Sequence, residues 1–188
     1  MATLNLSSFR MHIASAMLGL LALISVLPQQ AEAQNRANDG FSMEEIIGSG
    51  QRFFGSTSGG IASAIEKVFQ NYGLPNGYIL GEEGSGAFVG GLTYGEGKLY
   101  TKNAGDHKTY WQGPSLGWDF GGQGSRVMML VYNLDDVNQL YGRYAGVSGS
   151  AYVIAGAGFN VLKRSNILLV PVRTGVGARL GWCCSVLH

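Results

Sequence analysis

The sequence contains one motif that matches a known pattern for a catalytic nucleophile. Gly113-Pro114-Ser115-Leu116-Gly117 fits G-x-S-x-G, in which a serine lies on a tight turn between a strand and a helix. A serine hydrolase also needs a histidine as general base, and the one histidine that follows Ser115 is the final residue, His188. In a chain with 30 glycines such a match arises readily by chance. A hydrolase that uses Ser115 is therefore kept as an alternative.

Other residue types that carry chemistry do not gather along the chain. Phosphate-binding glycine motifs are absent from the sequence, and no His, Cys, Asp and Glu residues cluster with metal-ligand spacing. The pairs Glu82-Glu83 and Asp135-Asp136 are adjacent, so we interpret each as a turn or a helix start rather than as an acid/base dyad. We interpret Cys183-Cys184 as two unlinked cysteines without a catalytic role. The sequence therefore predicts no enzyme activity, no metal and no cofactor.

Arginines in apolar strands are the stronger candidates for a binding site. An arginine that points into a small barrel must be paired or must bind an anion, whereas an arginine that points outward is solvated. Arg126, Arg173 and Arg179 lie in apolar or glycine-rich segments, and Asp119, Tyr132 and Asn133 are candidate partners. Together with an aromatic residue these side chains would line a polar cavity for a phosphate or a lipid head group. The candidate ligand-binding residues are Arg126, Tyr132, Asn133, Arg173, Arg179, Asp119 and Trp111.

Composition limits the class of protein that carries these residues. The chain has 188 residues and a formal net charge of +1, which gives no electrostatic basis for a nucleic-acid partner. Charged residues make up 13% of the chain, about half the usual share. Two cysteines are too few for a disulfide scaffold. The length fits one domain with a substantial core.

The N-terminal residues match a secretory signal peptide. A short polar start ends at Arg10, an apolar run follows over 13–27, and Ala31-Glu32-Ala33 is a small-x-small cleavage site. The alternative is a membrane anchor, but the run is shorter than the ~20 apolar residues that a span needs. We expect residues 1–33 to be removed, residues 34–41 to form a linker, and 42–188 to form a helical lead-in plus a single barrel domain. The mature protein is then exported to the periplasm without a membrane span.

Two helices are predicted at the start of the mature chain. Ser42 and Glu45 match a capping box, which predicts a short helix over 43–54. Apolar residues recur at helical spacing from Ile61 to Tyr72, and Gly73 and Pro75 end that second helix. The aromatic residues of both helices are interpreted as core.

After Pro75 the spacing changes to short apolar runs separated by glycine. Bulky residues occupy the even positions from Leu168 to Trp182, whereas Arg173, Gly175, Gly177 and Arg179 occupy odd ones, with a bend expected over 174–177. Small residues on one face favour a tightly curved sheet. We therefore predict a mainly β fold, a small curved antiparallel sheet that closes into a soluble β-barrel, with the helices packed outside or across one end. An outer-membrane barrel is the rival. The predicted strands are 77–81, 84–93, 98–102, 115–120, 126–133, 151–162, 167–174 and 176–182, with a turn at 95–97 and a short helix over 134–141 capped by Asn133.

Three further segments of the chain are distinctive, namely residues 109–122, residues 130–136 and residues 173–177. They resemble the envelope integrity protein A family, and the resemblance extends from about Ser42 to Gly181. It implies a signal peptide, a periplasmic location, a small soluble barrel and a role in envelope integrity, without catalytic residues to carry over. The chain departs from the family's pattern over 182–188, which predicts a shortened or altered end and puts closure of the barrel in question.

A more distant likeness is to the SYLF lipid-binding domain. Its features fall on 111–115, 117–124, 127–133 and 134–140 of this chain. That likeness implies binding to a lipid or a membrane surface. We therefore expect a non-enzymatic envelope protein whose partner is a lipid or another envelope component. The alternatives are the Ser115 hydrolase and a purely structural protein-partner module, and the oligomeric state stays open.

Overall fold

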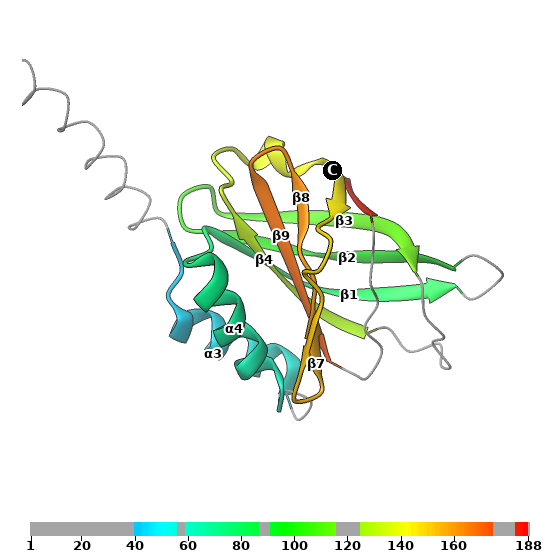
Figure 1. Cartoon of the computed structure of the whole chain (residues 1–188). Coiled ribbons are helices and arrows are strands. Elements are labelled where there is room, and N and C mark those ends of the chain that lie inside the picture. The colour runs from blue at the N-terminus through cyan, green and yellow to red at the C-terminus, as the bar shows by residue number, and fades with distance from the viewer. Residues whose placement is uncertain (1–39, 56–58, 87–90, 116–124, 175–182, 188) are drawn as a thin grey trace, which may run out of the picture. The chain divides into compact units, whose positions relative to one another are not determined.

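The computed structural model describes residues 40–55, 59–86, 91–115, 125–174 and 183–187, all within the compact unit Asp39–His188. Two helices come first, α3 (Met43–Phe54) and α4 (Ile61–Tyr72), and strands follow (Figure 1). The predicted signal peptide lies outside the described residues. The strands are β1 (Gly77–Gly86), β2 (Gly91–Thr101), β3 (Asp106–Ser115), β4 (Ser125–Tyr132), β5 (Gly142–Gly146), β6 (Tyr152–Ile154), β7 (Ala157–Phe159), β8 (Leu162–Arg164), β9 (Ile167–Thr174) and β10 (Cys183–Leu187).

Within the described residues, eight strands close into an antiparallel barrel. They follow one another in the order β4-β1-β2-β3-β10-β5-β8-β9, and β9 pairs again with β4. β7 pairs with the end of β9 and β6 pairs with β7, so these two strands extend the sheet beside the ring. β10 pairs with both β3 and β5, so this C-terminal strand completes the ring. The predicted fold class is confirmed.

β4 and β9 separate two hydrophobic cores, because successive side chains of a strand point to opposite faces. Val127, Met129 and Leu169 point into the barrel, where the core also includes Ile79, Leu99 and Trp111. Met128, Leu130, Val170 and Val172 point outward and pack against the helices. Burial of each large aliphatic side chain contributes about 1.5–3 kcal/mol. The bulky even positions of β9 therefore form the face covered by helices, and its odd positions form the concave face.

The helices form as their end signals predict. The Ser42 hydroxyl accepts from the Glu45 N–H at 3.2 Å, and the Glu45 carboxylate accepts from the Ser42 N–H at 2.7 Å. This capping hydrogen bond, with the nearby Lys102, lowers the pKa of Glu45. α4 ends at Gly73, whose φ of 75° favours glycine. The helices bury Ile46 and Phe54 from α3, and Ile61, Ile65 and Phe69 from α4, against the outer face of the barrel (Figure 1).

The prediction of a hairpin turn at residues 95–97 is wrong. Gly95 and Gly97 lie in the middle of β2, and the next strand, β3, begins at Asp106. A Cβ at Gly95 would overlap the indole of Trp111, and a Cβ at Gly81 would lie 2.6 Å from the Trp111 Cη2 atom. Gly81 and Gly95 are required because the Trp111 side chain lies across their strands, not because the chain reverses there.

Several further boundaries differ from the sequence prediction: the predicted strands 77–81, 84–93 and 98–102 are the longer strands β1 and β2, and most of β3 and all of β5 were not predicted. The strand predicted over 151–162 is three strands, β6, β7 and β8, since Ala155 and Gly156 adopt positive φ angles and form a turn. The predicted helix over 134–141 is the shorter 3-10 helix η2 (Val137–Leu140), and its cap is Asp136, whose carboxylate accepts from the Asn138 N–H at 2.7 Å. The predicted strand and bend over 175–182 lie outside the described residues.

We predict that Gly95→Ala destabilises the fold much more than Gly84→Ala. A Cβ at Gly84 would meet nothing within 4 Å, so this exposed strand glycine is the matched control. Overpacking against the indole is expected to lower the free energy of unfolding by about 2 kcal/mol. Urea unfolding of both variants measures the difference. Equal stabilities would contradict the close contact between Gly95 and Trp111.

Candidate functional site

The interior of the barrel holds a buried ion pair between Glu83 and Arg173. Glu83 lies on the inner face of β1 with its side chain 1% exposed, and Arg173 on β9 is 19% exposed. The Arg173 Nε donates to Glu83 Oε2 at 2.9 Å and its Nη2 donates to Oε1 at 2.7 Å. The indole Nε1 of Trp111 also donates to Oε1, at 3.0 Å. One carboxylate thus accepts three hydrogen bonds from side chains on two other strands.

The register of the sheet places these three side chains together. Glu83 is opposite Gly95 on β2, and Gly95 is opposite Trp111 on β3, so the indole crosses the bare glycine to reach the carboxylate. Arg173 is opposite Val127 on β4, which in turn pairs with Gly81 on β1. The guanidinium therefore reaches across β4 inside the barrel. The network connects β1, β3 and β9, which are not neighbours in the ring.

This network decides what the interior arginine is able to do. Moving a carboxylate and a guanidinium out of water costs several kcal/mol per ion, which a bidentate pair with further hydrogen bonds offsets. The guanidinium of Arg173 is engaged with Glu83, and the interior of the barrel also holds an aliphatic core. The arrangement is therefore suited to holding the barrel closed.

The structure brings together two of the seven predicted ligand-binding residues, Trp111 and Arg173. Arg126 lies on the outer face, where its Nη1 donates to the Phe53 carbonyl at 2.7 Å. Asn133 donates to the Asn166 carbonyl at 3.0 Å. Asp119 and Arg179 lie outside the described residues.

Tyr132, the remaining member of the predicted set, lies under the helices, beside Tyr72. Burial is the main cause that raises the pKa of the Tyr132 hydroxyl, followed by the nearby Tyr72. Tyr132 therefore belongs to the core between helices and sheet. It does not approach Arg173, whose partner in the interior is Glu83, a residue interpreted from the sequence as part of a turn or a helix start.

Ser115 does not occupy a catalytic arrangement with the described histidine. Ser115 and His107 lie on the same strand, β3, eight residues apart and hence roughly 25 Å from each other. The His107 Nε2 is 2.8 Å from the Ala104 carbonyl in the adjacent loop. His188 and the residues that follow Ser115 directly lie outside the described residues. Across the part of the chain that the structure describes, no group of three His, Cys, Asp or Glu side chains is placed to hold a metal ion.

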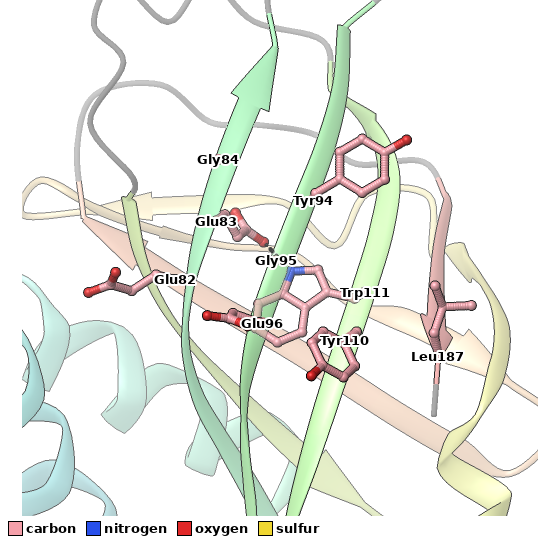
Figure 2. A pocket seen from close by; sticks show the side chains of 9 residues that line it. All are labelled: Glu82, Glu83, Gly84, Tyr94, Gly95, Glu96, Tyr110, Trp111 and Leu187. Carbon is pink, nitrogen blue, oxygen red and sulfur yellow. Dashed lines mark hydrogen bonds between the residues drawn. The ribbon is translucent and has the colours of Figure 1, made fainter.

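An open pocket with a volume of about 570 Å³ lies on the side of the sheet formed by β1, β2, β3 and β10 (Figure 2). Such a volume is within the range of small-molecule sites. Gly84 and Gly95 are among its lining residues, and the Trp111 indole lies directly against Gly95. The lining residues are Glu82, Glu83, Gly84, Tyr94, Gly95, Glu96, Tyr110, Trp111 and Leu187.

The exposed part of this pocket combines aromatic rings with ion-paired carboxylates. Tyr94 is 56% exposed, Tyr110 is 36% exposed and Leu187 is 43% exposed. Glu96 Oε2 lies 3.8 Å from the Nζ of Lys108, and Glu82 Oε1 lies 3.7 Å from the Nε of Arg126. A hydrogen bond to Tyr110 is the largest cause that raises the pKa of Lys108. The pocket thus offers rings and hydrogen-bonding groups with little net charge.

The pocket could not be predicted from the sequence, although the alternation of residues along β1 indicated that Glu83 points inward. Tyr94, Glu96 and Tyr110 become neighbours through the pairing of β2 with β3, and the sequence interpretation placed a turn at 95–97 within that pairing. The period-two series Ile79, Gly81, Glu83 marks Glu83 as an inward residue once β1 is extended to its full length.

The comparisons with known proteins agree on the fold. The family described as Envelope integrity protein A matches residues 39–188. A crystal structure of a β-barrel-like, uncharacterized protein from Brucella abortus is 77% identical in sequence, with a TM-score of 0.74; the match covers 79% of this chain and 94% of that one. No curated protein is detectably similar in sequence.

We predict that Arg173→Met lowers the free energy of unfolding by about 3 kcal/mol, because it leaves the Glu83 carboxylate buried without its cation. The double variant Glu83→Gln/Arg173→Met should recover at least half of this loss, since the glutamine oxygen still accepts from Trp111. Lys98→Met, which removes the exposed pair with Asp106, is the control and should change stability little. Chemical unfolding measures all three. A stable Arg173→Met variant would show that the pair is unimportant.

Proposed function

Because the chain belongs to the envelope integrity protein A family, we propose that it is a periplasmic, non-enzymatic β-barrel that supports the cell envelope by binding a lipid or another envelope component. The observation that carries this proposal is the division of the barrel. The arginine inside is paired with a buried carboxylate, whereas an open pocket with exposed tyrosines lies on the sheet. The binding surface is therefore the pocket, and the barrel is its rigid support.

The periplasmic location is supported by the signal peptide predicted over residues 1–33. In the described part of the chain, none of the helices has the length and apolar character needed to cross a bilayer. The rival outer-membrane barrel is disfavoured by charge on the outward face of β2 and β3, where Glu96, Lys98 and Lys108 are exposed. Charged side chains facing lipid at the bilayer midplane cost up to about 2–4 kcal/mol each.

A non-enzymatic role is supported by the geometry around the candidate nucleophile. Ser115 lies at the end of a paired strand and far from His107. The carboxylates Glu82 and Glu83 diverge to opposite faces of β1, as expected for neighbours on a strand. The pair therefore does not form an acid/base dyad.

We predict that cells lacking the protein become more sensitive to detergent, because an envelope component loses its binding partner. The full-length chain should restore resistance, whereas a chain without residues 2–33 should not, since it stays in the cytoplasm. The measurement is survival on detergent plates, with the mature N-terminus of the exported protein sequenced in parallel.

The Ser115→Ala variant separates the binding role from the hydrolase alternative. It should restore resistance fully, because binding at the pocket does not use this hydroxyl. If the folded Ser115→Ala protein fails to restore resistance, the non-enzymatic proposal is wrong. If removal of residues 2–33 has no effect, the periplasmic site of action is wrong.

A further inference from the structure

The pocket on β1, β2, β3 and β10 carries the chemistry of a saccharide site. Resting on the proposed function, we infer that its ligand is an uncharged saccharide chain of the envelope rather than a lipid. The pocket pairs two exposed aromatic rings with hydrogen-bonding groups whose charges are already balanced. Three features of the pocket favour such a ligand, namely its exposed aromatic rings, its balanced charges and its open shape.

The aromatic rings come from two neighbouring strands. Tyr94 and Tyr110 both point outward, since they alternate with the buried residues Thr93 and Trp111. Their exposed fractions of 56% and 36% leave ring surface accessible beside the hollow. Sugar rings present patches of C–H bonds that pack on the electron-rich face of an aromatic ring. Two such rings on neighbouring strands beside one pocket offer stacking surfaces to a saccharide chain.

The charges around the pocket disfavour an anionic ligand. Each of its three lining carboxylates has a cation within 4 Å: Glu82 has Arg126, Glu83 has Arg173 and Glu96 has Lys108. An anionic lipid head group would meet these carboxylates first and gain no unpaired cation among the described lining residues. Sugar hydroxyls both donate and accept hydrogen bonds, so they are able to use the carboxylates and the ammonium group together.

The openness of the pocket also disfavours a lipid chain. An acyl chain requires an enclosed apolar cavity, because its burial from water is the driving force. In this barrel the described interior is filled by side chains such as Val127, Met129 and Leu169. The pocket instead lies along the sheet with glycine at Gly84 and Gly95 (Figure 2), which leaves room for a chain that passes across the surface.

Calorimetric titration of the mature full-length protein tests this inference with defined probes. The soluble probes are the hexamer of β-1,4-linked N-acetylglucosamine and the neutral polysaccharide released from outer membranes by mild acid. Intact sacculi, tested by co-sedimentation, separate a peptidoglycan source from an outer-membrane source. Vesicles of phosphatidylethanolamine and phosphatidylglycerol test the lipid. We expect binding to at least one saccharide probe, with little change between 50 and 500 mM salt, because screening acts on charged ligands.

Variants of the pocket show whether the rings make the contact. The double variant Tyr94→Ala/Tyr110→Ala should weaken saccharide binding at least about tenfold. Tyr152→Ala is the matched control, because Tyr152 on β6 is 40% exposed and lies outside the pocket. Glu96→Gln should weaken binding less than the loss of the rings, since an amide oxygen still accepts a hydroxyl proton. Circular dichroism confirms that each variant is folded.

Three results overturn the inference: no saccharide probe binds, the vesicles bind instead, or the double tyrosine variant binds saccharide as well as Tyr152→Ala does. These outcomes are distinct from failure of the proposed function. If the tyrosine variants restore detergent resistance in cells and do not bind saccharide, the envelope role stands and the saccharide assignment falls. If Ser115→Ala abolishes resistance, the proposed function itself fails.

Discussion

The rest of the barrel depends on one buried carboxylate. Glu83 is inside a sheet whose other inward residues are largely aliphatic, and an ion there is tolerated because Arg173 and Trp111 supply three hydrogen bonds. The three residues belong to strands that are not adjacent, so satisfying the carboxylate requires the ring to close. The same requirement places the indole of Trp111 across Gly95, which is why β2 has a glycine at its centre. Closure, strand register and the glycine at position 95 are thus all needed to bring this one interaction together.

Two parts of the outer face of the sheet have different roles. One part of the outer face, on β4 and β9, is covered by α3 and α4 and forms a second core with residues such as Met128 and Val170. Another part, on β1 to β3 and β10, carries exposed rings and ion-paired carboxylates beside a pocket. The helices cover the first part, and among the described residues the second part carries an open pocket. The interior ion pair stiffens the sheet beneath it.

Much of the fold could be predicted because its signals are local. The capping box at Ser42, the helix end at Gly73 and the alternation along β9 each depend on residues close in sequence, and the structure has all three. The candidate site could not be predicted in the same way. A glycine at position 95 is compatible both with a turn and with close packing against a large side chain. The residue that decides between the two, Trp111, lies on another strand. Likewise Arg173 was a candidate inward residue, with an outward orientation as the alternative, but its partner Glu83 is distant in sequence and was interpreted as part of a turn or a helix start.

A direct comparison of two variants tests the central claim, that the inside of the barrel maintains the fold and the outer pocket binds the ligand. The measurement is the affinity of folded Met129→Ala, an interior variant outside the pocket, and of folded Tyr94→Ala/Tyr110→Ala for one envelope preparation, at a temperature where both remain native. The account predicts that the Met129 variant binds like the unmodified protein and that the tyrosine variant loses binding. Loss of binding in the Met129 variant, with full binding in the tyrosine variant, would contradict it and return the ligand site to the interior.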